Sequence, residues 1–193
     1  YDVQAGAVRI DGVDVRELAS ADLRRLVTVV PQDVFLFADT VRENIRYGDP
    51  GATDAQVEEA ARRAQAHDFI SRLSNGYDSQ VGELGATLSG GQRQLVAFAR
   101  AVLADPRILI LDEATANVDA NTEARIQEAM DEIRRDRSTL IIAHRFSTLR
   151  KADRIVVIED GRIVGEGSHE DLVASNPTYQ RLYRRQWADA NPG

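Results

Sequence analysis

Short runs of apolar residues alternate along the chain with amphipathic helical patterns. Val and Ile dominate these runs, which is typical of buried strands in an α/β domain. The turn dipeptide Asp160-Gly161 joins two of the runs and predicts an antiparallel hairpin, so the sheet is expected to be mixed, and Asp11-Gly12 is a second turn. The runs that we expect to form strands cover residues 7–10, 26–30, 108–111, 139–143, 154–158 and 162–166.

Between residues 33 and 103 the pattern changes to helices. Thr53 and Gln56 have the spacing of a capping box, and an Ala- and Glu-rich run follows to residue 66. A later helix is expected to begin near Gly91 and to present on one face Leu95, Phe98, Ala99 and Val102. Further helices are expected over 121–135, 168–174 and 178–187. We therefore predict one domain, with an α/β core from residues 1–32 and 104–193 and a helical subdomain from residues 33–103.

Composition limits the classes of protein that the chain can represent. Its 193 residues, 43% hydrophobic and 28% charged, suit one globular domain with a sizeable core. The net charge of -7 argues against a protein held on nucleic acid by phosphate contacts. Cysteine is absent, which excludes disulfides, thiolate metal sites and Cys nucleophiles. The longest apolar runs are far shorter than the roughly 20 residues that span a bilayer.

Polar side chains follow several of the predicted strands. Asp112 and Glu113 come directly after the run 108–111, Gln32 follows the strand that ends at Val30, and His144 follows the run 140–143. In open α/β sheets, ligands gather at the carboxyl ends of strands, so these positions suit a site. Each also has a purely structural interpretation, because acids favour helix starts and an isolated Gln or His is often an ordinary loop or packing residue.

Two further motifs precede predicted helices. Leu88-Ser-Gly-Gly-Gln92 leads into a long amphipathic helix, where glycines allow close approach and free N–H groups favour an anion such as phosphate. Ser89 as a plain N-cap is the alternative. Asp119 is likewise placed to cap the helix that follows it.

In order and spacing, the whole set resembles the nucleotide-binding domain of ABC transporters. Gln32, Leu88–Gln92, Ile108–Glu113, Asp119 and His144 are similar to that family's Q-loop, LSGGQ signature, Walker B strand with catalytic glutamate, D-loop and switch histidine. The resemblance covers essentially the whole chain. It implies a P-loop NTPase-like mixed sheet with an inserted helical subdomain, and only Asn117 and Val118 before Asp119 depart from the usual pattern.

Finer features resemble the exporter branch of that family. They are Val30-Pro-Gln-Asp-Val-Phe-Leu-Phe37, Thr40-Val-Arg-Glu-Asn-Ile45 and Gly82-Glu-Leu-Gly85. In that branch the segments near Gln32 and Glu83 face the transmembrane domains. The resemblance therefore implies a chain at the cytoplasmic face of the cell membrane, with transmembrane domains and a second nucleotide-binding domain as partners and no nucleic acid.

The resemblance also implies roles for individual residues around ATP and Mg²⁺. Asp112 would hold Mg²⁺, Gln32 would sense the ion and the attacking water, and Glu113 would act as general base. His144 would contact the γ-phosphate. The signature motif would cover the ATP that the opposite subunit holds, through Ser89, Gly90, Gly91 and Gln92, and Asp119 would lie beside them.

One element that ATP binding needs in this family is absent from the chain. A Gly-Lys-Ser/Thr loop reaches the β- and γ-phosphates and holds Mg²⁺. Lys151 is the only lysine, and it stands between Arg150 and Ala152. The opening residues look like those that follow the Walker A helix, so we expect a domain that is incomplete at its N-terminus, with exposed apolar surface. We expect the chain alone to hydrolyse no ATP.

Three hypotheses follow for the function. The first is an ATPase subunit, or a piece of one, that powers solute export. The second is a non-catalytic half that donates its signature motif to a complete partner, although Glu113 and His144 favour the first. The third, an ABC-type ATPase acting on DNA, is disfavoured by the acidic charge and by the absence of coiled-coil heptads.

The last predicted helix carries a stripe of bulky residues. Tyr179, Leu182, Tyr183 and Trp187 share one helical face, beside three arginines. A membrane-surface helix is one interpretation. We expect packing onto the domain instead, because aromatic stripes usually cover a core and three basic residues attract a membrane only weakly.

Overall fold

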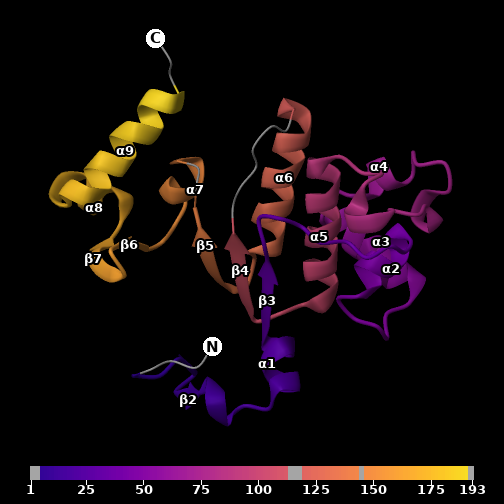
Figure 1. The fold of residues 1–193 in the computed structure, drawn as a ribbon, viewed down its shortest axis with the longest axis horizontal. Coiled ribbons are helices and arrows are strands. Elements are labelled where there is room, and N and C mark those ends of the chain that lie inside the picture. Colours follow the sequence, from indigo (N-terminus) through magenta and orange to yellow (C-terminus); the bar gives the residue numbers. More distant parts are fainter. Residues whose placement is uncertain (1–4, 113–118, 144–145, 191–193) are drawn as a thin grey trace. The chain divides into compact units, whose positions relative to one another are not determined.

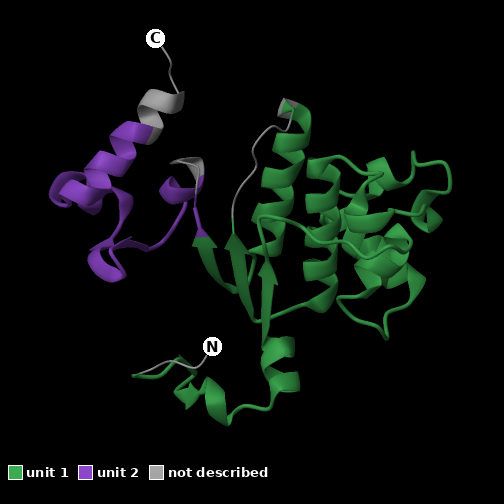
Figure 2. Ribbon diagram, viewed as in Figure 1, with its two compact units in different colours: residues 1–141 green, residues 142–193 purple. Residues whose placement is uncertain are grey.

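The computed structural model describes residues 5–112, 119–143 and 146–190. The chain divides into two compact units, residues 1–141 and residues 142–193, which are coloured separately in Figure 2. Each unit is described by itself below. The expected division into a core and the helical subdomain 33–103 stays a prediction.

The first unit begins with a short hairpin and a helix. Strands β1 (Arg9–Ile10) and β2 (Val13–Asp14) pair in antiparallel fashion, and Asp11 and Gly12 both have positive φ at the turn between them. The strand expected over residues 7–10 is therefore shorter than predicted. A 3₁₀ turn (Val15–Glu17) and helix α1 (Ser20–Leu26) follow.

A three-stranded sheet in the order β3-β4-β5 lies at the centre of this unit (Figure 1). Strand β3 (Val27–Val30) pairs in parallel with β4 (Ile108–Asp112), with Val30 opposite Leu111, and β5 (Ser138–Ile142) lies on the other side of β4. Each strand lies within one residue of its predicted range. The parallel pairing confirms the expected α/β class.

The connection from β3 to β4 is helical, as predicted. It contains α2 (Val41–Arg46), α3 (Asp54–Arg63), α4 (His67–Ile70), 3₁₀ turns at Gly76–Asp78 and Glu83–Gly85, and the long α5 (Gly90–Ala104). The capping box at Thr53 and Gln56 is present. Helix α5 lies between this group and α6 (Ala120–Ile133), and the four predicted apolar residues on it are all buried (Figure 1).

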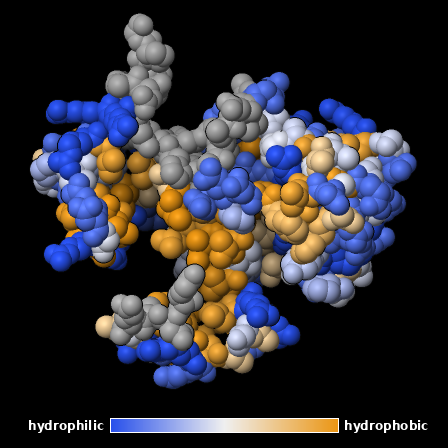
Figure 3. Space-filling view, viewed as in Figure 1, coloured by the Kyte–Doolittle hydropathy of each residue, from blue (hydrophilic) through white to orange (hydrophobic). Residues whose placement is uncertain are grey.

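The sheet buries only one of its faces. Val30, Leu109 and Leu111 belong to the same core as the buried residues of α5 and α6. Val29 and Leu140 are 56% and 61% exposed, and hydrophobic residues gather over the strands in Figure 3. Apolar surface is therefore exposed, as expected from the sequence.

The second unit contains the predicted hairpin. Helix α7 (Phe146–Arg150) precedes β6 (Ile155–Glu159) and β7 (Arg162–Gly167), which pair in antiparallel fashion around Asp160 and Gly161. Helices α8 (His169–Ser175) and α9 (Pro177–Ala190) follow. Tyr179 of α9 is buried with Ile155, Val157 and Leu172, so this part of the aromatic stripe packs onto the unit. No helix among the described residues is long and apolar enough to cross a bilayer.

Candidate functional site

Two of the predicted site residues come together at one edge of the sheet. Asp112 is the last residue of β4, and Gln32 follows the end of β3 by two positions. Because Val30 lies opposite Leu111 in a parallel pair, both side chains stand at the same carboxyl edge. Glu113 and His144 lie just beyond the ends of β4 and β5, outside the described residues. Their placement at this edge stays a prediction.

The chemistry of this edge suits a hard cation that arrives with a phosphate. Asp112 is half-buried and offers carboxylate oxygens, while Gln32 is exposed and offers an amide oxygen. Among the described residues, no three acidic or histidine side chains gather into a metal cage. Mg²⁺ usually takes one or two carboxylates together with phosphate oxygens and water, so the donor set fits that ion only together with a nucleotide.

The signature motif begins helix α5 with a capping box. The Gln92 N–H donates to Ser89 Oγ at 3.3 Å, and the Ser89 N–H donates to Gln92 Oε1 at 2.9 Å. Gly90 and Gly91, in the first turn, have N–H groups that no helix geometry can satisfy internally. These groups, at the positive end of a 15-residue helix, are suited to an anion.

A tight junction supports the start of this helix. Arg93 Nη1 donates to the Leu88 carbonyl at 2.7 Å. Gly85 has a φ of 76°, and a Cβ there would lie 2.7 Å from Arg93 Cδ and 3.1 Å from Leu36 Cδ1. A side chain at this position would be strained by the positive φ and would displace Arg93 or Leu36. The junction thus packs the 3₁₀ turn Glu83–Gly85 between the signature helix and the loop that follows Gln32.

Asp119 has a structural role in the described residues. Its Oδ1 accepts hydrogen bonds from the N–H groups of Asn121 and Thr122, both at 3.1 Å, so it is the N-cap of α6. Hydrogen bonding from Thr122, through the side chain and then the backbone, lowers the pKa of Asp119. Asp119 is exposed, and its position beside ATP stays a prediction.

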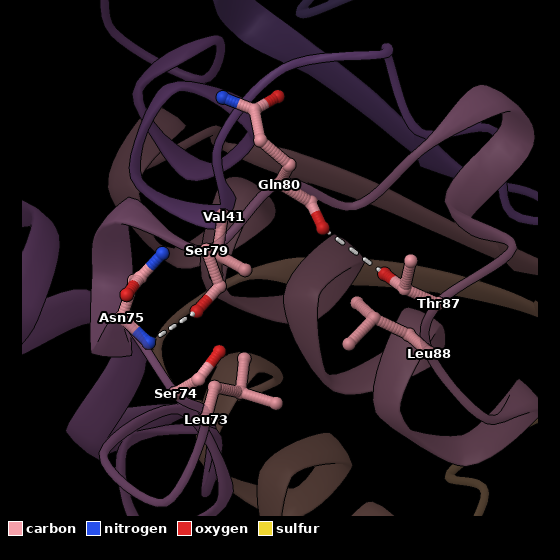
Figure 4. Close-up of a pocket in the computed structure, with 8 residues that line it drawn as sticks. All are labelled: Val41, Leu73, Ser74, Asn75, Ser79, Gln80, Thr87 and Leu88. Atoms are coloured by element: carbon pink, nitrogen blue, oxygen red, sulfur yellow. Dashed lines mark hydrogen bonds between the residues drawn. The ribbon is translucent and has the colours of Figure 1, made fainter.

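A pocket of about 330 Å³ opens beside the signature motif (Figure 4). Leu88 and Thr87 form one wall, and residues of the loop 73–80 form the opposite one. The Thr87 hydroxyl donates to the Gln80 carbonyl at 3.2 Å, and the Asn75 N–H donates to Ser79 Oγ at 3.2 Å. No lining residue is charged, so this pocket does not suit a polyphosphate.

Sequence analysis missed an aromatic cluster around Arg100. The Phe35 and Phe37 rings meet edge to face at 5.1 Å, and Tyr47 lies 4.7 Å from Phe37. The Arg100 guanidinium lies 5.3 Å from the Tyr47 ring centroid and 5.8 Å from that of Phe37. We call Phe35, Phe37 and Tyr47 the aromatic face; Phe35 is 51% and Tyr47 61% exposed. The exporter-like stretch 30–37 could have indicated the two phenylalanines, but no periodic pattern of apolar residues indicates a role for Arg100.

Fold and candidate site together define a class of protein. A parallel β3–β4 pair with Gln32 and Asp112 at its carboxyl edge is typical of a P-loop NTPase-like nucleotide-binding domain. A solved bacterial Atm1-family ABC exporter with ATP bound has this fold: it superimposes with a TM-score of 0.89 at 44% identity, over 96% of this chain and 32% of the exporter chain. The predicted fold class is confirmed.

The model of the ABC transporter family matches residues 1–116, and the chain belongs to this family. It is 50% identical over 193 residues to the ATP-dependent lipid A-core flippase of Syntrophus aciditrophicus, covering all of this chain and 32% of that protein. A Staphylococcus aureus (strain NCTC 8325) ATP-binding/permease protein, whose name proposes multidrug export, is 52% identical over 186 residues, 96% of this chain and 32% of the relative. The chain spans about a third of these relatives.

Proposed function

We propose that the chain is the ATP-binding and hydrolysing part of an ABC exporter. It would power solute export from the cytoplasmic face of the cell membrane, with ATP sandwiched between two such domains. The observation that carries this proposal is the parallel pairing of β3 and β4, which brings Gln32 and Asp112 to one sheet edge. The exporter relatives over the whole chain support it.

The hydrolytic half of the site comprises the residues at and beyond the strand ends. Asp112 and Gln32 would hold Mg²⁺, which supplies neutralisation of phosphate charge when it is bound. Glu113, directly after Asp112, would accept a proton from the attacking water as general base. His144 would donate a hydrogen bond to the γ-phosphate, where negative charge develops.

The signature half would act on the ATP of the second domain. Gly90 and Gly91 carry first-turn N–H groups that have no intrahelical partner, and Ser89 and Gln92 fix the helix start through their capping box. A γ-phosphate approaching this end meets both N–H donors and the positive end of the helix. Asp119 would stand beside the same ATP, as the resemblance implies.

The membrane partner would meet the aromatic face and the neighbouring Leu84. Leu84 is 64% exposed and has a φ of 54°, a conformation that is unfavourable for a bulky residue. Phe35, Phe37 and Leu84 belong to the exporter-like segments of the sequence, and Tyr47 follows one of them by two residues. Exposed apolar side chains that cluster on one surface suit contact with cytoplasmic ends of transmembrane helices.

The test places the chain in a complete exporter. The 193 residues replace the matching segment of the Staphylococcus aureus relative, and ATP turnover of the chimera is measured in lipid vesicles. We expect turnover that Glu113→Gln lowers by about a hundredfold or more, as loss of a general base implies. Glu59→Gln, which changes an exposed partner of Arg62 on α3, should leave turnover unchanged. A chimera that assembles and binds ATP without hydrolysing it would refute the proposal.

A second candidate function rests on the signature motif, whose capping box and helix start are complete in the described residues. In it, the chain lends its signature motif to a complete partner domain and hydrolyses nothing itself. The two candidate functions are best distinguished by mixing the chain with the complete nucleotide-binding domain of the Staphylococcus aureus relative. If the mixture associates in ATP and this association depends on Ser89, while Glu113→Gln has no effect on turnover, the donor function holds. Steady turnover by the chain alone, abolished by Glu113→Gln, would contradict the expected inactivity.

A further inference from the structure

Arg100 is a largely buried cation with unusual partners. Burial lowers its pKa below the ordinary value for arginine. No carboxylate among the described residues pairs with it; instead it faces the rings of Phe37 and Tyr47. Burying a cation without a counter-ion is unfavourable unless hydrogen bonds compensate, so the bonds that it makes indicate its purpose.

Those bonds join three segments of the chain. Arg100 Nε donates to the Asn44 carbonyl at 2.9 Å and Nη2 donates to Asn44 Oδ1 at 3.1 Å, on α2. Its Nη1 donates to the Phe35 carbonyl at 3.3 Å, in the loop that begins with Gln32. The planar guanidinium serves all three acceptors at once, which an ammonium group cannot reproduce.

Asn44 extends the same network into the loop. It is 1% exposed, and its Oδ1 accepts the Phe37 N–H at 2.9 Å while its Nδ2 donates to the Phe37 and Thr40 carbonyls, each at 3.0 Å. The loop carrying Phe35 and Phe37 is therefore fixed through Asn44 and Arg100 to α5.

A second anchor lies at the same level of α5. A Cβ on Gly48, just after α2, would lie 2.2 Å from the Arg100 carbonyl oxygen, so the two backbones are in contact there. Arg100 follows Gln92 by eight residues on one uninterrupted helix, about 12 Å along its axis. A displacement of the aromatic face would move α5 and its first turn with it.

We propose that Arg100 is a positioning residue that makes the aromatic face and the signature helix move as one body, a role that rests on the proposed function. Arg100 touches neither nucleotide nor metal in this scheme. It acts through Asn44 and Phe35, and it transmits a push from the membrane partner to Ser89–Gln92.

The functional arm uses the chimeric exporter described above. Arg100→Lys should leave basal ATP turnover and its KM unchanged, and should lower the stimulation by transported solute about fivefold or more, the scale of a typical coupling energy. Arg62→Lys, on the exposed side of α3, should change neither quantity. Full stimulation in Arg100→Lys, or a parallel fall of basal and stimulated turnover, overturns the proposal. A chimera without any turnover contradicts the proposed function instead.

The second arm is independent of activity and uses the 193-residue chain. In the native chain, the Phe37 amide should exchange with deuterium at the rate of amides in the middle of α5, because the two open together. In Arg100→Lys this amide should exchange about tenfold faster or more, as the loss of hydrogen bonds to a charged group implies, while β4 amides keep their rate. Exchange at Phe37 that is independent of α5 in the native chain overturns the proposal, whatever the chimera does.

Discussion

The helical segment between β3 and β4 and the central sheet bury their apolar residues to different extents. In the helical segment, each α-helix buries large apolar side chains, and the buried set includes Leu36, Ile45, Val57, Ile70, Leu95 and Phe98. The sheet buries one face against α5 and α6 and leaves Val29 and Leu140 exposed on the other. Sheets with parallel strands are ordinarily covered on both faces.

The two regions carry different parts of the proposed site, and their stability depends on different contacts. The helical segment holds the aromatic face and the signature motif on the larger part of a core that it shares with one face of the sheet. The sheet edge with Gln32 and Asp112 depends on strands whose open face is apolar. The stability of the signature half should therefore respond to its own core residues, and that of the sheet should respond to whatever covers the open face.

The largest effect should come from a core residue of the helical segment. Phe98→Ala removes a ring that is 2% exposed and should lower the free energy of unfolding by about 3–5 kcal/mol. Leu140→Ala removes an exposed side chain and should change it by less than about 0.5 kcal/mol. Urea unfolding followed by circular dichroism measures both. Equal losses would mean that the two regions do not differ in packing.

Overpacking at the α2–α5 contact should have the next largest effect. Gly48→Ala places a methyl group against the Arg100 carbonyl and should destabilise the chain by about 1–3 kcal/mol. Gly51→Ala is the matched control, because its Cβ would meet only Asp49 Oδ1 at an ordinary 3.4 Å. Thermal unfolding of the two variants distinguishes them, and similar melting temperatures would contradict the tight contact.

The capping box at the signature motif should contribute a smaller amount. Ser89→Ala should lower the free energy of unfolding by about 1 kcal/mol, whereas Ser89→Gly should lower it by only a few tenths. The pair separates capping from chemistry: if the hydroxyl also contacts ATP, both variants should lose ATP-dependent association equally. Association that follows stability, with the glycine variant near native, would limit Ser89 to capping.

The smallest effect concerns pH and tests burial in the helical segment. Burial raises the pKa of Tyr77 from the ordinary tyrosine value to about 12, and its hydroxyl lies 2.8 Å from His67 Nδ1. Because its pKa is raised, Tyr77 keeps its proton to a higher pH in the folded chain than in the unfolded chain. The contribution of protonated Tyr77 to the free energy of unfolding is therefore complete below pH 10 and is lost as the pH rises toward 12. Absorbance at alkaline pH should show a late ionisation that Tyr77→Phe removes. Its persistence in that variant would assign it elsewhere.

Local sequence patterns predicted many of the strands and helices, and the elements that they missed or misjudged lack a clear local signal. Apolar runs marked the strands because buried strands need continuous apolar sequence, and Thr53 marked α3 because its capping box is purely local. Helix α1 escaped prediction because it is short and its N-cap, Ala19, makes no side-chain capping bond. The extent of the first strand was overestimated, because only Arg9 and Ile10 pair with β2.

Local sequence pattern likewise predicted only some of the functional residues. Gln32 and Asp112 could be placed at one edge because strand ends in a parallel sheet share an edge. The Arg100 network could not, since its partners Asn44 and Phe35 are 56 and 65 residues away in the chain and only the packed tertiary structure brings them together. Polar residues that act through distant carbonyl groups leave no periodic trace in a sequence.

The path of the chain from β3 to β4 has a topological consequence. The connection leaves the carboxyl end of β3 and returns to the start of β4, and α5 alone is the crossover helix that a parallel pair requires (Figure 1). Helices α2 to α4 are therefore an insertion within a simpler β-α-β unit. A lineage could lengthen, shorten or replace that insertion without disturbing strand order. Under the proposed function, the surface that meets the membrane partner can therefore change while Gln32 and Asp112 keep their places at one sheet edge.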